Sequence, residues 1–479
     1  MPSKKPRIVM IVPRGEAVRN FLYSETLSRL ARDAEIVLLS VVEGFEEDAH
    51  IRPYVSKLVP LREHEERYPV TLLRGLITDA HFRWLWSGVA RNNRETADAR
   101  PRTFWKSARY RVWKAVVRSL AFRPVLEELT RLENDLAWRL RPTREFDALF
   151  EALQPDLVFN CSHIHGPAGE LPCRVARRMG IPVAGFIFSW DNLTSRSRII
   201  VPYDHYLVWH EGMKRTLLAQ YPFIDPARVH VTGTPQFDFH FRDDFLLPRE
   251  ELCRRIGIDP ALPYILYTTG VDRHFPEEHL HVRAVIDILR DPAFPVPCRL
   301  VVRTYVKGTS REMRALAAEQ CDGVVFPPVE WDERWYTPSY GDLSLYTSLL
   351  RHAAMGINAA STVSLELLMF GKPVVNIGFD PPGSSLPRHL RWRRHIEFDH
   401  YAPVASSGAV MVANSADDMR AMIRRGLLDP ENGADARKRF IREMFGDTLD
   451  GKSGSRVASV LLRLAGEASE RKARLSGCA

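Results

Sequence analysis

The chain has 479 residues, of which 45% are hydrophobic and 26% charged, and its formal net charge is +8 at pH 7. This length exceeds one ordinary hydrophobic core, so two domains are expected, and the composition excludes a disordered protein. No apolar run approaches the roughly 18–20 residues of a membrane span, and the six scattered cysteines form no C-x-x-C pair, which argues against a zinc site or a disulfide framework. We therefore expect a cytoplasmic protein without a metal or another cofactor.

The N-terminal stretch reads as a βαβ opening. MPSKKPRIVMIV predicts a first strand, Arg7–Val12, rather than a signal peptide. A helix over 17–32 and a strand over 35–42 are expected to follow. The connecting loop, PRGEAVRN, carries Glu16 but lacks G-x-G-x-x-G, so a classical dinucleotide site is not expected. Residues 45–80 read as irregular.

Residues 81–124 hold much of the positive charge. They contain eleven Lys or Arg residues against two acidic ones, interleaved with Phe and Trp. We expect one or two amphipathic helices that either cover a sheet edge or lie at an anionic membrane surface. The plainer alternative has the aromatic side chains inward and the basic ones in water. Nucleic acid is not expected as a partner, because no recognition module is present. Residues 124–153 predict one further helix.

From residue 154 the pattern of strands and helices becomes regular. A strand over 156–160 precedes a loop with His163 and His165, and a strand over 183–188 precedes a loop with Trp190, Asp191 and Asn192. Polar residues beyond the carboxyl ends of parallel strands are where α/β proteins bind ligands. Strands over 206–209 and 230–232 follow. We expect this domain, including its basic–aromatic insertion, to span 1–240.

A second α/β series occupies 241–440, and a helical C-terminal segment occupies 441–479. Its strands are expected at Tyr264–Thr268, Arg299–Arg303, 324–326, Met355–Asn358, Val374–Ile377 and 410–412. Thr269 and Gly270 follow the first of these strands, where they would either form a loop of backbone donors to a ligand or be an ordinary connecting loop. Arg303 ends the next strand, where its charge either faces a ligand or is solvated.

The stretch MGINAASTVSLELLMFGKPVVNIGFD, residues 355–380, is the most informative. It predicts a strand, a turn of small residues, a helix and a second strand, with Gly371 in a left-handed conformation after the helix. Such a unit directs backbone N–H groups and a positive helix end at one point, which suits a phosphate. Ser361, Thr362 and Ser364 add hydroxyls, and Glu366 could accept hydrogen bonds from a ribose. The alternative is an ordinary βαβ unit with a Ser N-cap.

These features resemble the GT-B glycosyltransferases. Nucleotide-sugar transferases and bacterial glycerophosphotransferases carry a similar strand, Ser/Thr turn, helical Glu and Gly-Lys-Pro. The tail DGKSGSRVASVLL is similar to the ending of those enzymes, and SWDNLTSRSRIIVPYDHYLVWHEGMK resembles bacterial surface-carbohydrate glycosyltransferases. The resemblance implies two Rossmann-like α/β domains facing a cleft, with the C-terminal helix returning to the N-terminal domain. The nucleotide sugar would lie mainly against the C-terminal domain and the acceptor against the N-terminal one.

The resemblance also implies residue roles. Ser361 and Thr362 become pyrophosphate ligands and Glu366 the ribose ligand, with Ser364, Arg303, Thr269 and Gly270 as further donor-site candidates. The candidates for the general base are Asp191, His165, Glu16 and His163. Trp190, Asn192 and His163 are expected to position the acceptor. No D-x-D occurs, so a metal-independent reaction is expected, and the E-x7-E spacing of retaining enzymes is absent because Asn358 stands eight residues before Glu366.

The expected function is transfer of a sugar from a nucleotide diphosphate donor to a surface glycan or lipid-linked acceptor. A CDP-polyol phosphotransferase, a nucleotide-sugar 2-epimerase and a non-catalytic GT-B binding protein are the alternatives. Residues 446–453, GDTLDGKS, match a Walker A motif formally. They follow a helix rather than a strand, however, so a nucleoside triphosphatase is not expected. Membrane association would place the protein beside a lipid-linked acceptor.

Overall fold

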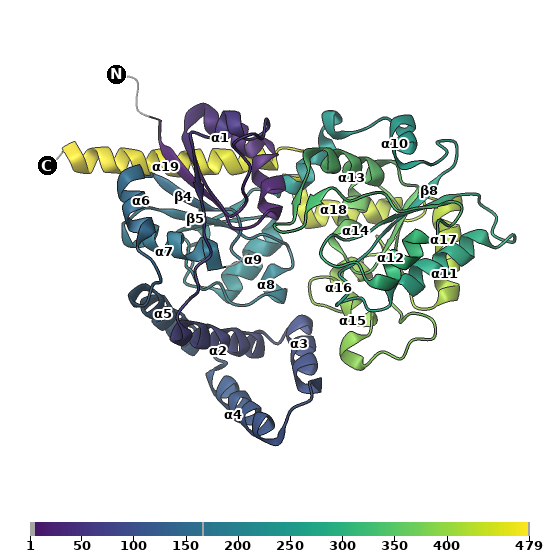
Figure 1. Ribbon diagram of the computed structural model, residues 1–479, viewed down its shortest axis with the longest axis horizontal. Coiled ribbons are helices and arrows are strands. Elements are labelled where there is room, and N and C mark those ends of the chain that lie inside the picture. Colours follow the sequence, from purple (N-terminus) through teal and green to yellow (C-terminus); the bar gives the residue numbers. More distant parts are fainter. Residues whose placement is uncertain (1–4, 165–166, 478–479) are drawn as a thin grey trace. The chain divides into compact units, whose positions relative to one another are not determined.

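The computed structural model describes residues 5–164 and 167–477. The chain divides into two compact units (Figure 1). Unit 1 comprises Met1–Asp238 and Thr448–Ala479, and unit 2 comprises Phe239–Asp447. Each unit contains one parallel sheet covered by helices, which is the expected fold class. No helix within 5–164 and 167–477 is long and apolar enough to cross a membrane.

Unit 1 is built on a seven-stranded sheet of order β3-β2-β1-β4-β5-β6-β7. The strands are β1 (Arg7–Val12), β2 (Glu35–Ser40), β3 (Lys57–Pro60), β4 (Leu157–Asn160), β5 (Val183–Phe186), β6 (His205–Val208) and β7 (Val229–Val231). All of the strand pairs are parallel. The central strands are almost continuous runs of buried apolar residues, because helices cover both faces of the sheet.

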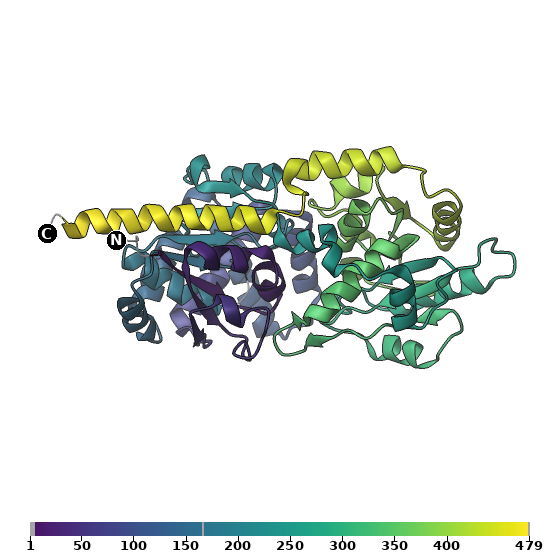
Figure 2. The same ribbon diagram turned by 90° about the horizontal axis from the view of Figure 1, so that it is seen from above.

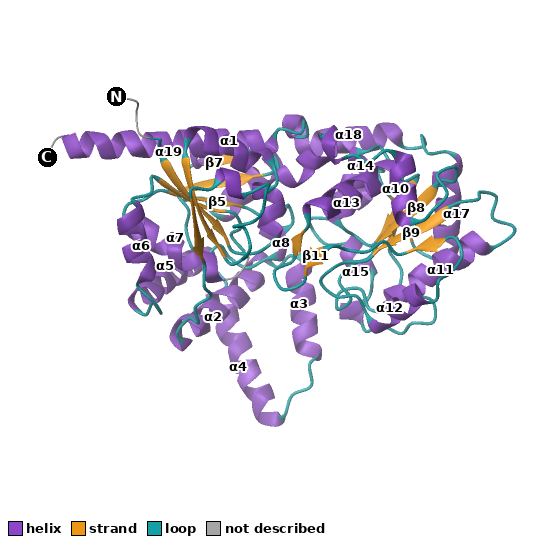
Figure 3. Ribbon diagram, turned by 45° about the horizontal axis from the view of Figure 1, so that its top comes forward, coloured by secondary structure: helices purple, strands orange, loops and turns teal. Residues whose placement is uncertain are grey.

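The described residues of unit 1 form ten α-helices. They are α1 (Glu25–Asp33), α2 (Tyr68–Leu85), α3 (Gly88–Ala99), α4 (Phe104–Leu120), α5 (Arg123–Arg139), α6 (Glu145–Leu153), α7 (Glu170–Arg178), α8 (Asn192–Ser195), α9 (Glu211–Gln220) and α19 (Ser453–Gly477). The long C-terminal helix α19 lies beside α1 and β4 of this unit (Figure 2). Helices α6 and α7 lie on the opposite face of the sheet (Figure 3).

Three expectations for unit 1 were wrong. Residues 45–80 are not irregular, because they hold the short edge strand β3 and most of α2. The helix expected over 17–32 is broken into a π-helical turn, Val18–Leu22, and α1, whose N-cap Ser24 accepts a hydrogen bond from the Thr26 backbone N–H. The helix expected over 124–153 is two helices, since Pro142 lies between α5 and α6.

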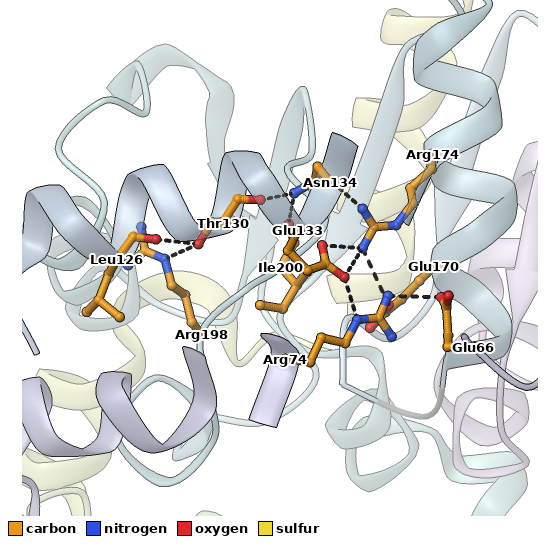
Figure 4. Close-up of polar contacts among 10 residues, drawn as sticks. All are labelled: Glu66, Arg74, Leu126, Thr130, Glu133, Asn134, Glu170, Arg174, Arg198 and Ile200. Atoms are coloured by element: carbon orange, nitrogen blue, oxygen red, sulfur yellow. Dashed lines mark hydrogen bonds and ion pairs between the residues drawn. The ribbon is translucent and has the colours of Figure 1, made fainter. Parts of the chain in front are cut away.

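A buried cluster of charges joins α2, α5 and α7 (Figure 4). Glu133, fully buried on α5, accepts hydrogen bonds from Arg74 Nε at 2.5 Å and from Arg174 Nη2 at 2.8 and 2.9 Å. Arg74 also pairs with Glu66 at 3.0 Å and Glu170 at 2.8 Å. Burial raises the pKa of Glu170, which reduces the excess of three carboxylates over two guanidinium groups. The cluster fixes the inserted helices to α7, because a buried charge without its partner is strongly unfavourable.

Unit 2 is built on a six-stranded sheet of order β10-β9-β8-β13-β14-β15. Its strands are β8 (Tyr264–Thr268), β9 (Arg299–Arg303), β10 (Val324–Val325), β13 (Met355–Asn358), β14 (Val374–Ile377) and β15 (Met411–Ala413), and β11 (Trp331–Asp332) pairs separately with β12 (Thr337–Pro338). Four of these strands have the bounds expected from the sequence. They are β8, β9, β13 and β14.

Helix α11 follows β8 and helix α14 follows β13, the two central strands of this sheet. The helices of unit 2 are α10 (Arg249–Ile256), α11 (Glu278–Arg290), α12 (Arg311–Ala318), α13 (Tyr340–His352), α14 (Thr362–Met369), α15 (Arg393–Ile396), α16 (Ala402–Ser406), α17 (Ala416–Leu428) and α18 (Ala434–Phe445). Helix α14 packs tightly on β13 because Gly356 has no side chain. A Cβ atom there would lie 2.1 Å from Leu367 Cδ1. Gly371 has a φ of 72°, the left-handed conformation expected after this helix.

The Walker-like segment is the capped start of α19. The buried carboxylate of Asp238 accepts hydrogen bonds from the backbone N–H groups of Ser453 at 3.0 Å and Gly454 at 2.7 Å. These are N–H groups that a phosphate-binding loop would offer to its ligand. An acidic side chain at this place also faces the positive end of the helix dipole. The Walker-like segment therefore attaches the start of α19 to Asp238, and it does not leave these N–H groups to a phosphate.

Replacing Asp238 should test this cap. Asp238→Ala should lower the free energy of unfolding by about 1–2 kcal/mol, and Asp238→Asn by less, because the amide oxygen still accepts a hydrogen bond. Burial raises the pKa of Asp238 from 3.8 to about 6. The folded state therefore retains a proton that the unfolded state has lost, and stability from Asp238 falls as pH rises from about 4 through 6.

Urea unfolding of the wild type and Asp238→Asn at several pH values from 4.5 to 7 would measure both effects, since about 1.4 kcal/mol corresponds to each pKa unit. The stability of the wild type relative to the Asn variant should decline across this range. A constant difference would contradict the titration of Asp238 in this window.

Candidate functional site

The order of strands in unit 2 creates a switch point between β8 and β13. From β8 the chain runs outward through β9 to β10, then returns beside β8 as β13 and runs the other way through β14 to β15. The loops after β8 and β13 therefore leave the sheet in opposite directions. In open α/β sheets ligands bind at this kind of position, outside the carboxyl ends of the strands. Thr269 and Gly270 follow β8, and residues 359–361 follow β13.

Four polar residues lie in one row across the carboxyl edge of this sheet. Arg303 pairs in register with Thr268, Thr268 with Asn358, and Asn358 with Asn376. All four are buried, and both asparagines are fully so. A row of buried polar side chains is unusual in the centre of a parallel sheet, because each group must find a hydrogen-bond partner.

The two asparagines belong to a buried hydrogen-bond network with Ser364 and Tyr401. Asn358 Oδ1 accepts from Ser364 Oγ and from Asn376 Nδ2, each at 2.9 Å. The Tyr401 hydroxyl lies 2.7 Å from Ser364 Oγ and 2.9 Å from Asn376 Oδ1. The network fixes the start of α14 against β13 and β14. Ser364 is fully buried, so its hydroxyl serves the interior of the unit.

The turn before α14 is the part of this site that remains partly exposed. Ser361 has extended backbone angles and its Oγ accepts a hydrogen bond from the Val363 N–H at 3.3 Å, so it is the N-cap that the sequence indicated. Thr362 is the first helical residue, and both side chains are half-buried. The N–H groups of a first helical turn have no partner within the helix and carry its positive dipole end. An anion would be stabilised at this turn.

Glu366 lies one turn further along α14 and is nearly buried. Its Oε2 accepts a hydrogen bond from the Tyr346 hydroxyl at 2.6 Å, and its Oε1 lies 3.1 Å from His240 Nε2. A ribose would have to share this carboxylate with both residues. No sequence pattern pointed to Tyr346 or His240, because they come from segments outside α14 in the chain.

Arg303 makes its contacts inside the unit. Its Nη2 donates to both carboxylate oxygens of Asp342 at 2.6 Å, and its Nη1 donates to the Pro328 carbonyl at 2.6 Å. Asp342 also accepts from Trp331 Nε1 at 2.7 Å. Arg303 is therefore neither solvated nor turned wholly toward a ligand. A contact with a diphosphate would weaken a buried ion pair, and that role of Arg303 stays a prediction.

The loop after β8 is held by Glu278, the first residue of α11. The Gly270 N–H donates to Glu278 Oε2 at 2.9 Å, and burial raises the pKa of this carboxyl to about 8. A Cβ atom on Gly270 would lie 2.0 Å from the ring of Phe275, so only glycine fits. Thr269 Oγ1 accepts from the Tyr305 N–H at 2.9 Å. Glu278 therefore positions the predicted donor loop, and it had no sequence signal of its own.

Unit 1 has its own switch point, between β1 and β4. The chain runs from β1 outward to β3 and returns as β4 on the other side of β1. Glu16 follows β1, where its carboxylate pairs with Arg14 Nε at 3.1 Å and is almost buried. His163 follows β4, and its Nδ1 accepts from the Phe188 N–H at 3.3 Å. His165 lies outside the described residues.

The environment of His163 disfavours it as a general base. Burial lowers the pKa of His163 to about 3, so the ring is neutral near pH 7 and binds a proton only weakly. An effective general base has a pKa near the working pH. A hydrogen-bonding role, such as positioning an acceptor, is compatible with a neutral imidazole.

The loop after β5 holds Asp191 in a fixed position. Ser189 Oγ and Ser195 Oγ each donate to one Asp191 carboxylate oxygen at 2.5 Å. Asn192 is buried, and its Oδ1 accepts from the Ser189 N–H at 2.8 Å, which makes it an anchor of the loop. Trp190 and Asp191 are partly exposed. The topology thus brings the loops of Glu16, His163 and Asp191 to one edge of the sheet, since β1, β4 and β5 are neighbours.

Over 5–164 and 167–477 no group of three or more His, Cys, Asp or Glu side chains could hold a metal ion. Metal independence of the reaction stays a prediction.

Comparison with known proteins gives a fold rather than a family. No family model matches the chain, and no curated protein matches its sequence. Among solved structures, a UDP-N-acetylglucosamine 2-epimerase matches with a TM-score of 0.53 at 12% identity, over 97% of this chain and 97% of its own. The UDP-GlcNAc 2-epimerase of Neisseria meningitidis, solved with UDP-GlcNAc, matches with a TM-score of 0.52 at 11% identity, over 96% and 100%.

The UDP-GlcNAc 2-epimerase of Methanocaldococcus jannaschii matches with a TM-score of 0.50 at 11% identity, over 95% of this chain and 99% of its own. At such low identity the likeness shows the fold alone. The chain has a GT-B type of fold with two Rossmann-like α/β units, as the sequence indicated.

Removing one hydroxyl should test the buried network of unit 2. Tyr401→Phe should lower the free energy of unfolding by about 1–3 kcal/mol, because buried groups of Ser364 and Asn376 lose a partner. Tyr68→Phe is the matched control, since Tyr68 is 74% exposed and should tolerate the change. Calorimetric unfolding of both variants measures the difference. Equal midpoints for the two would show that the network contributes no stability.

Proposed function

We propose that the protein is a glycosyltransferase that binds a nucleotide diphosphate sugar in unit 2 and transfers the sugar to a glycan or lipid-linked acceptor. The observation that carries the proposal is the β8/β13 switch point, where the loop of Thr269 and Gly270 lies beside the turn of Ser361 and Thr362. The turn is rigid on its inner side and partly exposed on its outer side. That combination suits a diphosphate, whose oxygens accept several backbone hydrogen bonds.

The chemistry of transfer needs two functions from these residues. The leaving nucleoside diphosphate develops negative charge, which preorganised N–H groups and a helix dipole stabilise. Ser361, Thr362 and the first turn of α14 supply this. The acceptor hydroxyl must lose a proton to a base. We assign this role to Asp191 because two serine hydroxyls hold its carboxylate in place while it remains partly exposed, with Glu16 as the alternative.

Nucleotide-sugar 2-epimerisation is the second candidate function. It is favoured by the solved structures of similar fold, because the three described above are all UDP-GlcNAc 2-epimerases by name. Both candidates need a nucleotide diphosphate sugar in unit 2, so binding does not separate them. They differ in whether an acceptor is consumed.

Nucleotide binding tests the diphosphate site directly. Thr362 is the first residue of α14 and follows an extended residue, so proline fits there without disturbing the helix. Thr362→Pro removes the N–H and the hydroxyl, and Thr362→Ala removes the hydroxyl alone. Their difference isolates the N–H, whose charge-assisted hydrogen bond should change UDP affinity by about 10- to 100-fold.

The matched control is Arg311→Pro, at the first position of α12, which should leave nucleotide affinity unchanged. Calorimetric titration with UDP, GDP, CDP and dTDP would also identify the base. Equal affinity of Thr362→Pro and Thr362→Ala for the preferred nucleotide would refute the use of this N–H. No affinity of the wild type for any of the four would refute the donor site as a whole.

Acceptor dependence separates the candidate reactions. A transferase should release nucleoside diphosphate in proportion to an added glycan or lipid-linked acceptor, whereas an epimerase should change the sugar with no acceptor present. Nuclear magnetic resonance of the nucleotide sugar over time distinguishes the two. Preference for CDP with labelled phosphate in the product would identify a polyol phosphotransferase, and binding without turnover a non-catalytic protein. Asp191→Asn should abolish transfer while nucleotide affinity is retained.

A further inference from the structure

Helix α4 exposes an unusual amount of apolar surface. Phe104 is 71% exposed, Trp105 79%, Val112 64% and Val116 40%. Helices of soluble proteins normally turn such residues toward the core. Isolated exposed apolar residues are common, but a group of them on one helix indicates an interaction surface.

These side chains share one side of the helix. At about 100° per residue, Phe104, Trp105, Val112 and Val116 fall within an arc of about 120°, together with Ala108 and Ala115. Basic residues lie along both borders of this apolar face. Arg109 borders it on one side, and Arg111 and Arg118 border it on the other, each of them exposed. An apolar face between two basic borders is the pattern of a helix that lies in a membrane interface.

The opposite side of α4 is fixed to the rest of unit 1. Val117 is buried, and Trp113 Nε1 donates to Asp79 of α2 at 2.7 Å. Tyr110 and Lys114 both bond to Asp98 of α3, at 2.8 and 3.2 Å. Helix α4 therefore lies on the outside of α2, away from the sheet of unit 1 (Figure 3). Its apolar face points outward because specific contacts hold the other face.

The positive charge of α4 indicates which kind of partner its apolar face would bind. The helix contains five Lys or Arg residues and no acidic residue. A second copy of this face would meet the same positive charge, which opposes self-association. A bilayer with anionic lipids supplies both a negative surface and an apolar layer beneath it. Each basic side chain near such a surface contributes to binding, and aromatic residues insert at the level of the head groups.

We propose that unit 1 binds anionic lipid bilayers through the exposed face of α4, with Phe104, Trp105, Val112 and Val116 inserted and Arg109, Arg111 and Arg118 on the head groups. The proposal takes up the membrane-surface interpretation of residues 81–124 and leaves the sheet-edge and solvated-charge interpretations as its alternatives. Membrane binding does not rest on the proposed transferase activity, although it would place a lipid-linked acceptor beside unit 1.

Co-sedimentation of the full chain with vesicles tests the proposal. The wild type should bind vesicles of phosphatidylcholine mixed with phosphatidylglycerol and not vesicles of phosphatidylcholine alone, and binding should weaken as salt is added. The triple variant Arg109→Ser, Arg111→Ser, Arg118→Ser should lose about 100-fold in partitioning. Its matched control, Lys438→Ser, Arg439→Ser, Arg442→Ser on the exposed side of α18, has the same charge change and should bind as the wild type does.

A second pair of variants tests the apolar face. Phe104→Ser with Trp105→Ser should reduce vesicle binding by at least about tenfold, whereas Leu132→Ser with Phe223→Ser, which are also exposed in unit 1, should not. Calorimetric midpoints equal to that of the wild type show that the variants fold.

Absence of wild-type binding to the anionic vesicles would overturn the proposal, as would equal binding by the α4 variants and their controls. Light scattering that shows a dimer of the wild type but a monomer of the Phe104 and Trp105 variant, with vesicle binding unchanged, would assign the face to self-association instead. Retained UDP affinity in the α4 variants keeps this test independent of the proposed function.

Discussion

The buried hydrogen bonds among Asn358, Ser364, Asn376 and Tyr401 are the constraint on which the candidate site depends. They hold the end of β13, the neighbouring strand β14 and the first turn of α14 in one geometry. Because these side chains bond to one another, the inner side of the turn is held in place while its outer side stays partly exposed. Gly356 adds to this by allowing α14 to pack directly on the strand. A ligand that binds at this turn would need little reorganisation of the protein.

Most of the charged groups at the carboxyl edges of the sheets are already satisfied within their own unit. Arg303 pairs with Asp342, Glu366 bonds with Tyr346, and serine hydroxyls bond to Asp191. Because such side chains are already ordered, binding a ligand would cost them little further conformational entropy. In the proposed donor site, backbone N–H groups rather than basic side chains would therefore be the principal anion contacts. This agrees with the chemistry that a helix N-terminus offers without a metal.

The inserted helices of unit 1 follow a different rule. Their inner side is fixed by the buried charges around Glu133 and by Asp79 and Asp98, so the insertion is a rigid part of the unit. Their outer side, on α4, carries exposed apolar and basic residues that are not packed into the core of the unit. Where an element is anchored by polar contacts and still exposes its apolar face, folding alone does not account for that face. The proposed binding of lipid bilayers would account for it.

The sequence by itself determined the elements whose signals are local. Strands β8, β9, β13 and β14 are short apolar runs bounded by turn residues, and Gly371 marks a helix end that only glycine adopts readily. The same local signals indicated two α/β units and a phosphate-type turn. The tertiary structure alone decided which partner each polar residue takes. Asp238 with Gly454, Glu366 with His240 and Arg303 with Asp342 lie 216, 126 and 39 residues apart, and no periodicity or motif links such pairs. Only the packing of distant segments brings them together. A buried charge needs a partner, and that partner can come from any part of the chain that the fold places beside it.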